Sequence, residues 1–183
     1  MDYVAISMEV VWENLDTPHI VELAATKVSC GKVIDNFYTL VSCPFSIPKE
    51  DDKRYVNIYD EQLVGAPNIK EALSAFFSFC KGHTLAGYFL PLDLEVLTYN
   101  AKKYGVDLNW DVQRYDDLCS QNIYVYSLVR KKLKRQLKIE ALPFVAHHLG
   151  ITDCYRNDSL ACAIQTAKIY EKLRGIDDVG FVS

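Results

Sequence analysis

The order of strand-like and helix-like segments predicts an α/β fold, with a central mixed sheet of about five strands flanked by helices. Three strand-like segments come first, and helical segments then alternate with strand-like ones. A strand meander followed by strand–helix units produces both antiparallel and parallel neighbours in one sheet. No linker or internal repeat divides the chain, so residues 1–183 are expected to form one domain.

The predicted strands are short and apolar. The first is almost wholly apolar, which is typical of a strand in the middle of a sheet. The next two form a hairpin, because the turn Cys30-Gly31-Lys32 separates two segments rich in β-branched residues. The strands are expected at residues 3–6, 20–29, 33–41, 84–89 and 112–115, and residues 42–57 are expected to form a surface loop.

The predicted helices have apolar residues three and four positions apart. Pro67 opens the first helix, in which Leu73 and Phe76 share one face. Gly105 and Gly150 each close a helix, because glycine readily adopts the left-handed conformation found after a helix end. The helices are expected at residues 68–81, 92–104, 118–131, 139–149 and 157–173.

Composition limits the class of protein. The net charge of −4 gives no general basic surface, so any contact with nucleic acid must come from a local patch. The six cysteines include no Cys-x-x-Cys pair, and most lie in apolar segments, as in proteins of a reducing compartment. Neither a signal peptide nor a membrane span is expected. The prediction is therefore a cytoplasmic protein without a membrane partner.

Three acidic residues occupy positions from which carboxylates could converge. Glu9 ends the first predicted strand, whereas Asp93 and Asp158 each lie in the first turn of a predicted helix. Such oxygen ligands suit Mg²⁺ or Mn²⁺, and two ions can hold the attacking water and the leaving oxygen of a phosphodiester. Taken alone, Asp93 and Asp158 are better explained as acids that complement the helix dipole.

Three segments resemble the motifs of the DEDDh (DnaQ-like, proofreading-type) 3′→5′ exonuclease superfamily. The first, DYVAISMEVV at residues 2–11, is similar to a family strand that ends in Asp-x-Glu. LAGYFLPLDLEVL at 85–97 and LGITDCYRNDSLACA at 149–163 resemble the second and third motifs. The motifs follow the family's order and span nearly the whole chain. The resemblance implies a ribonuclease H-like fold and metal-dependent removal of nucleotides from DNA or RNA 3′ ends.

The resemblance also implies an incomplete acidic site. Glu9, Asp93 and Asp158 stand at family acidic positions, which makes them the candidate catalytic residues and metal ligands. Ser7 stands where the family has an aspartate that bridges both metal ions, and Asp153 stands at the general-base histidine. Losing a general base typically costs about 10²–10⁴-fold in rate. We expect weakened or absent hydrolysis, with one or two Mg²⁺ or Mn²⁺ ions if the site is active.

Aromatic and basic side chains are the candidates for contact with nucleic acid. Tyr88 and Phe89 replace the family's His-Asn pair, and their rings could stack on bases, pack in the core or plug the former site. The basic stretch at 130–138 could hold phosphates, although a solvated helix end explains it as well. The candidates are Trp12, Tyr88, Phe89, Arg130, Lys131, Lys132 and Lys134.

Two functions remain open from the sequence. One is an impaired exonuclease that acts on DNA or RNA ends, and the other is a non-catalytic pseudo-exonuclease that binds nucleic acid or a protein partner. Ser7 and Asp153 together favour loss of catalysis. Several members of the family dimerise, so the resemblance leaves a homodimer open as well.

Overall fold

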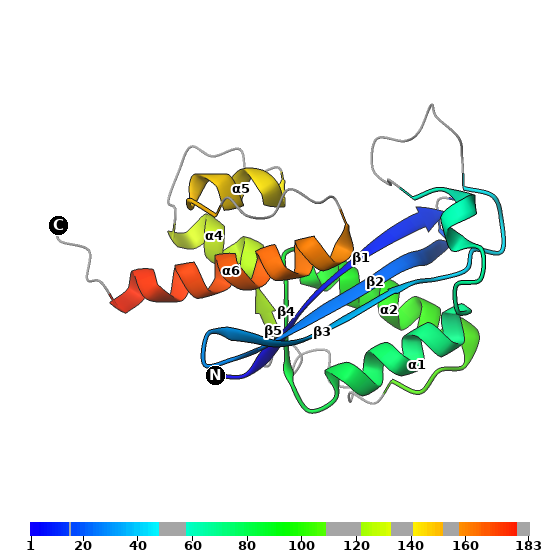
Figure 1. Ribbon diagram of the computed structural model, residues 1–183, viewed down its shortest axis with the longest axis horizontal. Coiled ribbons are helices and arrows are strands. Elements are labelled where there is room, and N and C mark those ends of the chain that lie inside the picture. The colour runs from blue at the N-terminus through cyan, green and yellow to red at the C-terminus, as the bar shows by residue number, and fades with distance from the viewer. Residues whose placement is uncertain (15, 48–57, 109–121, 133–140, 152–157, 179–183) are drawn as a thin grey trace.

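The computed structural model describes residues 1–14, 16–47, 58–108, 122–132, 141–151 and 158–178 (Figure 1). These residues contain a five-stranded sheet with the strand order β3-β2-β1-β4-β5. The strands are β1 (Tyr3–Trp12), β2 (Pro18–Ser29), β3 (Lys32–Leu40), β4 (Thr84–Gly87) and β5 (Asn122–Tyr124).

The sheet is mixed, as the sequence predicts. β1 pairs antiparallel with β2 and parallel with β4, so it lies at the centre. β2 and β3 form the antiparallel hairpin, and β4 and β5 pair in parallel. Because β1, β4 and β5 run in the same direction, the residues that follow them gather at one edge of the sheet.

Helices cover both faces of this sheet, with α1 and α2 on one side and α4, α5 and α6 on the other (Figure 1). Among the described residues, none of these helices has the length and apolar character that crossing a membrane requires. The helices are η1 (Asp60–Leu63, a 3₁₀ turn), α1 (Ile69–Cys80), α2 (Leu90–Tyr104), α4 (Val125–Lys132), α5 (Leu142–His148) and α6 (Ser159–Asp178).

The alternation of side chains along β1 divides the core into two clusters. Val4 and Ile6 pack with residues of α1 and α2. Tyr3 and Ala5 face the other way and pack with residues of α6. The side chains of Ser7 and Glu9 follow the parity of Tyr3 and Ala5, which places them on the α6 face of the sheet.

Local sequence signals explain the helix ends well. Asn68 and Glu71 form a reciprocal capping box at the start of α1, where Asn68 Oδ1 accepts from the Glu71 N–H at 3.0 Å. Gly105 ends α2 with a φ of 63°, and Gly150 has a φ of 72° after α5. These three helices therefore lie near their predicted positions, and Gly105 and Gly150 follow two of them as predicted.

Two strand predictions are wrong. The first strand extends through Trp12 rather than ending at residue 6, because β2 pairs with it along its whole length. Glu9 therefore lies within β1, next to a bulge, instead of at the end of a short strand. Residues 122–124 form β5 rather than part of a helix over 118–131, since they pair in parallel with β4. The strand predicted at 112–115 lies outside the described residues.

A close contact sets the start of α2 two residues earlier than the predicted residue 92. A Cβ atom at Gly87 would lie 2.9 Å from the Leu90 Cβ atom, so only glycine allows this approach. The chain consequently leaves β4 at Gly87, before the predicted residue 89, and enters the helix at Leu90. This tight passage positions the first turn of α2, which contains Asp93.

Candidate active site

Glu9 and Glu22 face each other across the central strand pair. Their Cα atoms are partners in the β1–β2 ladder, so both side chains lie on the α6 face of the sheet. Like charges directly opposite each other are unfavourable in a sheet. A pair of this kind in a protein interior needs either hydrogen-bond donors, a proton or a cation.

Asp93 completes an acidic pair with Glu9. Burial raises the pKa of Asp93 to about 8, and repulsion from Glu9 adds to the shift. Burial likewise raises the pKa of Glu9 to about 7, with a further contribution from Glu22. Each carboxyl group therefore holds a proton more tightly than it does in water. A divalent cation between them would replace the proton and remove the repulsion.

Glu22 is the residue at this site that our sequence analysis missed. Its side chain is buried and accepts three hydrogen bonds: Tyr38 Oη at 2.7 Å, the Ser159 N–H at 3.0 Å and Ser159 Oγ at 2.6 Å. Three donors satisfy the hydrogen-bonding requirement of a buried carboxylate. The detectable signal was a single acid in the otherwise apolar start of β2, Ile20 to Ala25.

Asp158 lies at the N-cap of α6 rather than inside the first turn of the helix predicted at 157–173. Its Oδ1 accepts from the Ala161 N–H at 2.7 Å, as N-cap side chains do. The adjacent Ser159 is bound to Glu22, so the start of α6 is held against the strand pair that contains Glu9. The structure thus brings Asp158 to the vicinity of the acidic pair, with its carboxylate engaged in capping.

The fit to a divalent metal is partial. Over the described ranges, no three His, Cys, Asp or Glu side chains are arranged as a metal-binding group. Glu9 and Asp93 offer two hard oxygen ligands with raised pKa values, which suits one Mg²⁺ or Mn²⁺ ion. Ser7 lies two residues before Glu9 on the same face of β1 and contributes no charge. Asp153 falls outside the described residues.

The aromatic candidates occupy two places near this edge of the sheet. Trp12 ends β1, three residues after Glu9, and is 48% exposed. Phe89 is the N-cap residue of α2 and is 41% exposed, whereas Tyr88 before it is buried. Within the described part of the chain, no hydrogen-bond partner reaches the Tyr88 hydroxyl. Tyr88 and Phe89, although adjacent in the sequence, therefore have different environments.

The basic candidates lie in the last turn of α4. Arg130 and Lys131 are exposed to solvent. The Nζ atom of Lys132 donates to the Leu173 carbonyl of α6 at 2.6 Å, which ties the two helices together. Lys134 lies outside the described residues. Arg130 and Lys131 are thus the described basic candidates that are open to a phosphate.

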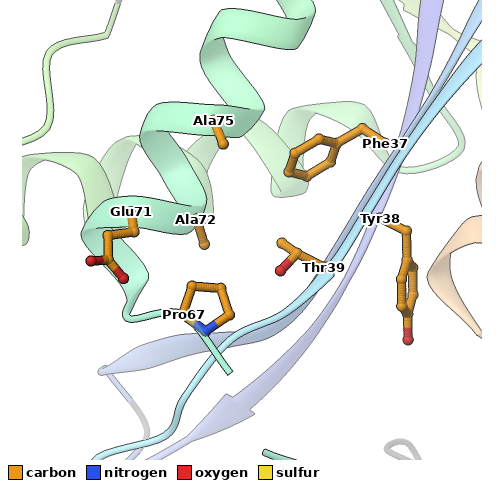
Figure 2. Close-up of a pocket in the computed structure, with 7 residues that line it drawn as sticks. All are labelled: Phe37, Tyr38, Thr39, Pro67, Glu71, Ala72 and Ala75. Carbon is orange, nitrogen blue, oxygen red and sulfur yellow. The ribbon is translucent and has the colours of Figure 1, made fainter. Parts of the chain in front are cut away.

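A separate hollow lies on the opposite face of the sheet. It has a volume of about 450 Å³ and lies between β3 and α1, with Phe37, Thr39 and Ala72 among its lining residues (Figure 2). Tyr38 points away from α1 in this view, toward the face where its hydroxyl donates to Glu22. The hollow is therefore distinct from the acidic pair.

Comparison with known proteins agrees with the geometry. The family model RNase_T, described as an exonuclease, matches residues 4–170. DNA polymerase III subunit epsilon of Aquifex aeolicus is 27% identical over 171 residues, covering 93% of this chain and 79% of that protein. A PolC-type DNA polymerase III of Caldanaerobacter subterraneus subsp. tengcongensis is 26% identical over 96% of this chain. The chain spans only 12% of the length of that polymerase.

Solved structures show the same fold. The nuclease domain of 3′hExo, a DEDDh family member bound to rAMP, superposes with a TM-score of 0.70 at 14% identity. That match covers 97% of this chain and 92% of the other. S. pombe Pop2p, in a form with bound Mg²⁺ and Mn²⁺, gives a TM-score of 0.68 at 12% identity, over 99% of this chain and 86% of the other. These likenesses confirm the ribonuclease H-like fold.

Proposed function

Because this chain belongs to the exonuclease family, whose model matches residues 4–170, we propose that it binds the 3′ ends of DNA or RNA and hydrolyses them weakly. The observation that carries the proposal is the acidic pair. Glu9 and Asp93 come from segments far apart in the sequence and repel each other at one edge of the sheet. Perturbed carboxyl groups at such a place are typical of a functional site.

We propose Glu9 and Asp93 as the ligands of a Mg²⁺ or Mn²⁺ ion, with Asp158 as a candidate third ligand. A bound ion would supply charge stabilisation for a phosphodiester and lower the pKa of a water molecule. The chain's own residues would position that ion, since β1 holds Glu9 and the tight β4–α2 passage holds Asp93. The comparison protein Pop2p has been solved with both metals, which supports this choice of cation.

Ser7 and Asp153 are the proposed cause of weak hydrolysis. A serine hydroxyl is neutral, so Ser7 removes one negative charge from the place where the family bridges two ions. A carboxylate at Asp153 is a weaker base near neutral pH than the imidazole it replaces. Both changes lower the rate by separate routes, one through metal occupancy and the other through proton transfer.

A restoration experiment tests the proposal. The variant with Ser7→Asp and Asp153→His should release mononucleotides from the 3′ end of a labelled single strand faster than the wild type, by about 10²-fold or more. Each single variant should give a smaller gain. Ser78→Asp, on the exposed side of α1, is a matched control and should change nothing. The assay needs Mn²⁺, with EDTA as the metal-free comparison.

Two outcomes separate the proposal from its alternative. Loss of the restored activity on adding Glu9→Gln would support the site as assigned. An inactive double variant that still folds would refute the proposed nuclease site. The alternative is a non-catalytic domain that binds nucleic acid or a protein partner, which is favoured because no three His, Cys, Asp or Glu side chains of the described residues are arranged to hold a metal ion.

The alternative predicts a different wild-type result. A non-catalytic domain should release no nucleotide even at high Mn²⁺ and with enzyme in excess, while still binding the oligonucleotide. The named epsilon relative is a subunit of a polymerase, which supports a protein partner for this chain. We propose that either activity is located in the cytoplasm, because Cys30, Cys43 and Cys80 form no disulfide among the described residues, as in reducing compartments.

A further inference from the structure

Three aromatic rings form a continuous ledge beside the acidic pair. The centroids of Phe89 and Tyr126 lie 5.0 Å apart with 33° between the ring planes. The Tyr126 and Tyr124 rings follow at 5.8 Å and 39°. Successive rings are thus tilted rather than perpendicular, and their faces turn gradually along the row. We call Phe89, Tyr126 and Tyr124 the aromatic ledge.

Tyr88 packs against the buried side of the ledge. Its ring meets Phe89 edge-on at 4.9 Å and 84°, and meets Tyr126 edge-on at 5.7 Å and 78°. Tyr88 is 6% exposed, whereas Phe89 is 41% exposed and the rings of Tyr124 and Tyr126 are partly exposed. Edge-to-face packing against a buried ring holds the outer rings in place while leaving part of their surface open.

The topology of the sheet explains why these residues meet. Gly87 and Tyr124 are partners in the parallel ladder between β4 and β5. Phe89 and Tyr126 lie two residues beyond those partners, so equivalent positions past two neighbouring strands bring the rings together. The Tyr126 N–H also donates to the Tyr88 carbonyl at 3.3 Å, which locks the two chain segments in register.

The ledge adjoins the acidic pair through α2. Asp93 lies one helical turn after Phe89, and its N–H donates to the Phe89 carbonyl at 3.3 Å. The opposite end of the ledge carries positive charge. Arg130 lies four residues after Tyr126 on α4, so the two side chains share one face of that helix. Asp93 and Arg130 thus each lie one helical turn after a ring of the ledge.

We propose that the aromatic ledge stacks the bases of a single-stranded nucleic acid just upstream of its 3′ end, and that Arg130 contacts the backbone there. This inference rests on the proposed function and adds the substrate class. Single-strand binders combine aromatic platforms with basic residues in this way, and stacking contributes a factor of about 5 to 150 in affinity per base. Since every base has an aromatic face, the ledge should tolerate any sequence.

A binding experiment on the full chain tests the ledge. The probes are a 5′-labelled oligothymidylate and an abasic strand of the same length, measured by fluorescence anisotropy in EDTA. The wild type should bind the thymidylate at least about 5-fold more tightly than the abasic strand. Tyr126→Leu and Tyr124→Leu should each remove most of that difference and leave abasic binding unchanged.

Tyr99→Leu is the matched control, because Tyr99 is a partly exposed ring on the same helix α2, ten residues after Phe89. It should leave both affinities at wild-type values. Equal affinity of the wild type for the two strands would overturn the proposal. So would a ring variant that folds, by circular dichroism, and binds thymidylate as the wild type does.

Photo-crosslinking of the unaltered chain covers the case in which a ring variant fails to fold. A bromouridine placed next to the 3′-terminal nucleotide should crosslink to Phe89, Tyr124 or Tyr126. A crosslink that maps to any other surface would refute the proposed role of the ledge. Failure of the proposed hydrolysis is distinguishable from failure of the ledge. If binding depends on the rings but no nucleotide is released, only the nuclease proposal is refuted. If nucleotide is released at the same rate by the wild type and the ring variants, only the proposed role of the ledge is refuted.

Discussion

At the scale of single residues, repulsion between Glu9 and Asp93 lowers the stability of the fold when no cation is bound. Glu9 and Asp93 are held close together because β1 and the start of α2 meet at this edge, and neither carboxyl group is paired with a cation in the described residues. Sites that must bind charged ligands often store such repulsion. This loss of stability appears only at pH values at which both carboxyl groups are ionised, so it depends on pH.

The first prediction concerns this pH dependence. A raised pKa means that the folded state binds protons more tightly than the unfolded state, so stability falls as pH rises from about 4 to about 8. In EDTA at pH 8, Glu9→Gln should raise the free energy of unfolding by about 1–3 kcal/mol, and near pH 4 it should have little effect. Urea denaturation at both pH values measures this.

The exposed residue Glu13 provides the control, since Glu13→Gln should leave stability unchanged at both pH values. Mn²⁺ should stabilise the wild type at pH 8 and stabilise Glu9→Gln less, because a cation relieves the same repulsion. An equal effect of Glu9→Gln at the two pH values would contradict the repulsion argued here.

The second prediction concerns Glu22, whose carboxylate joins β2, β3 and α6. Glu22→Ala would leave the Ser159 N–H and hydroxyl without their acceptor in a buried place, at a cost of about 2–4 kcal/mol. Tyr38→Phe removes only the contact of a half-exposed phenol and should cost about 1 kcal/mol. Chemical denaturation compares the two, and equal costs would show that Glu22 does not hold α6.

At the scale of elements, the passage from β4 to α2 determines where Asp93 lies. Leu90 packs directly against the Gly87 backbone, with no space for a side chain. Asp93 is in the first turn of α2, three residues after Leu90. A small shift of this turn would therefore change the separation of the two acidic side chains.

The third prediction tests this contact. Gly87→Ala places a Cβ 2.9 Å from Leu90 Cβ, so it should cost about 1–3 kcal/mol and weaken Mn²⁺ binding at the acidic pair. Gly175→Ala, in α6, is a matched control without any atom near its added Cβ, and it should be neutral or stabilising by up to about 1 kcal/mol. Thermal denaturation and Mn²⁺ titration give the two readouts; an unaffected Gly87 variant would refute the argument.

At the scale of the whole molecule, a net charge of −4 must coexist with the proposed binding to a polyanion. General attraction is absent, so binding must rely on the basic end of α4 and on contacts that do not depend on charge. Arg130 and Lys131 are exposed there, and Arg130 lies one helical turn after Tyr126 of the aromatic ledge. The separate contributions of charge and of stacking to affinity can be measured from the dependence of affinity on salt concentration.

The fourth prediction follows from that division. Each phosphate contact steepens the slope of log affinity against log salt by about 0.7 for a single strand, so the two open basic residues, Arg130 and Lys131, give a slope of about −1.4. Lys131→Gln should reduce its magnitude by about 0.7, and Lys70→Gln on α1 should not. A slope twice as steep would mean that a basic surface outside α4 dominates binding.

Much of the fold was predictable because its signals are local. The hairpin of β2 and β3, the capped helix α1 and the glycine that ends α2 all follow from residues within a few positions of each other. β5 was not predictable in this way. Its three residues form a strand because β4 offers a parallel partner, and a helix pattern over the same residues gave no sign of that partner.

For the site, the sequence by itself determined which residue types were present: the three acids at family positions, the serine in place of a fourth, and the aromatic pair before α2. Only the tertiary structure decided which of them interact. Glu9 and Asp93 meet, Asp158 caps α6, Glu22 joins the site, and Tyr124 and Tyr126 extend the aromatic row. The reason is physical: repulsion, burial and ring contact depend on distance in space, and strand pairing sets those distances between residues far apart in the chain.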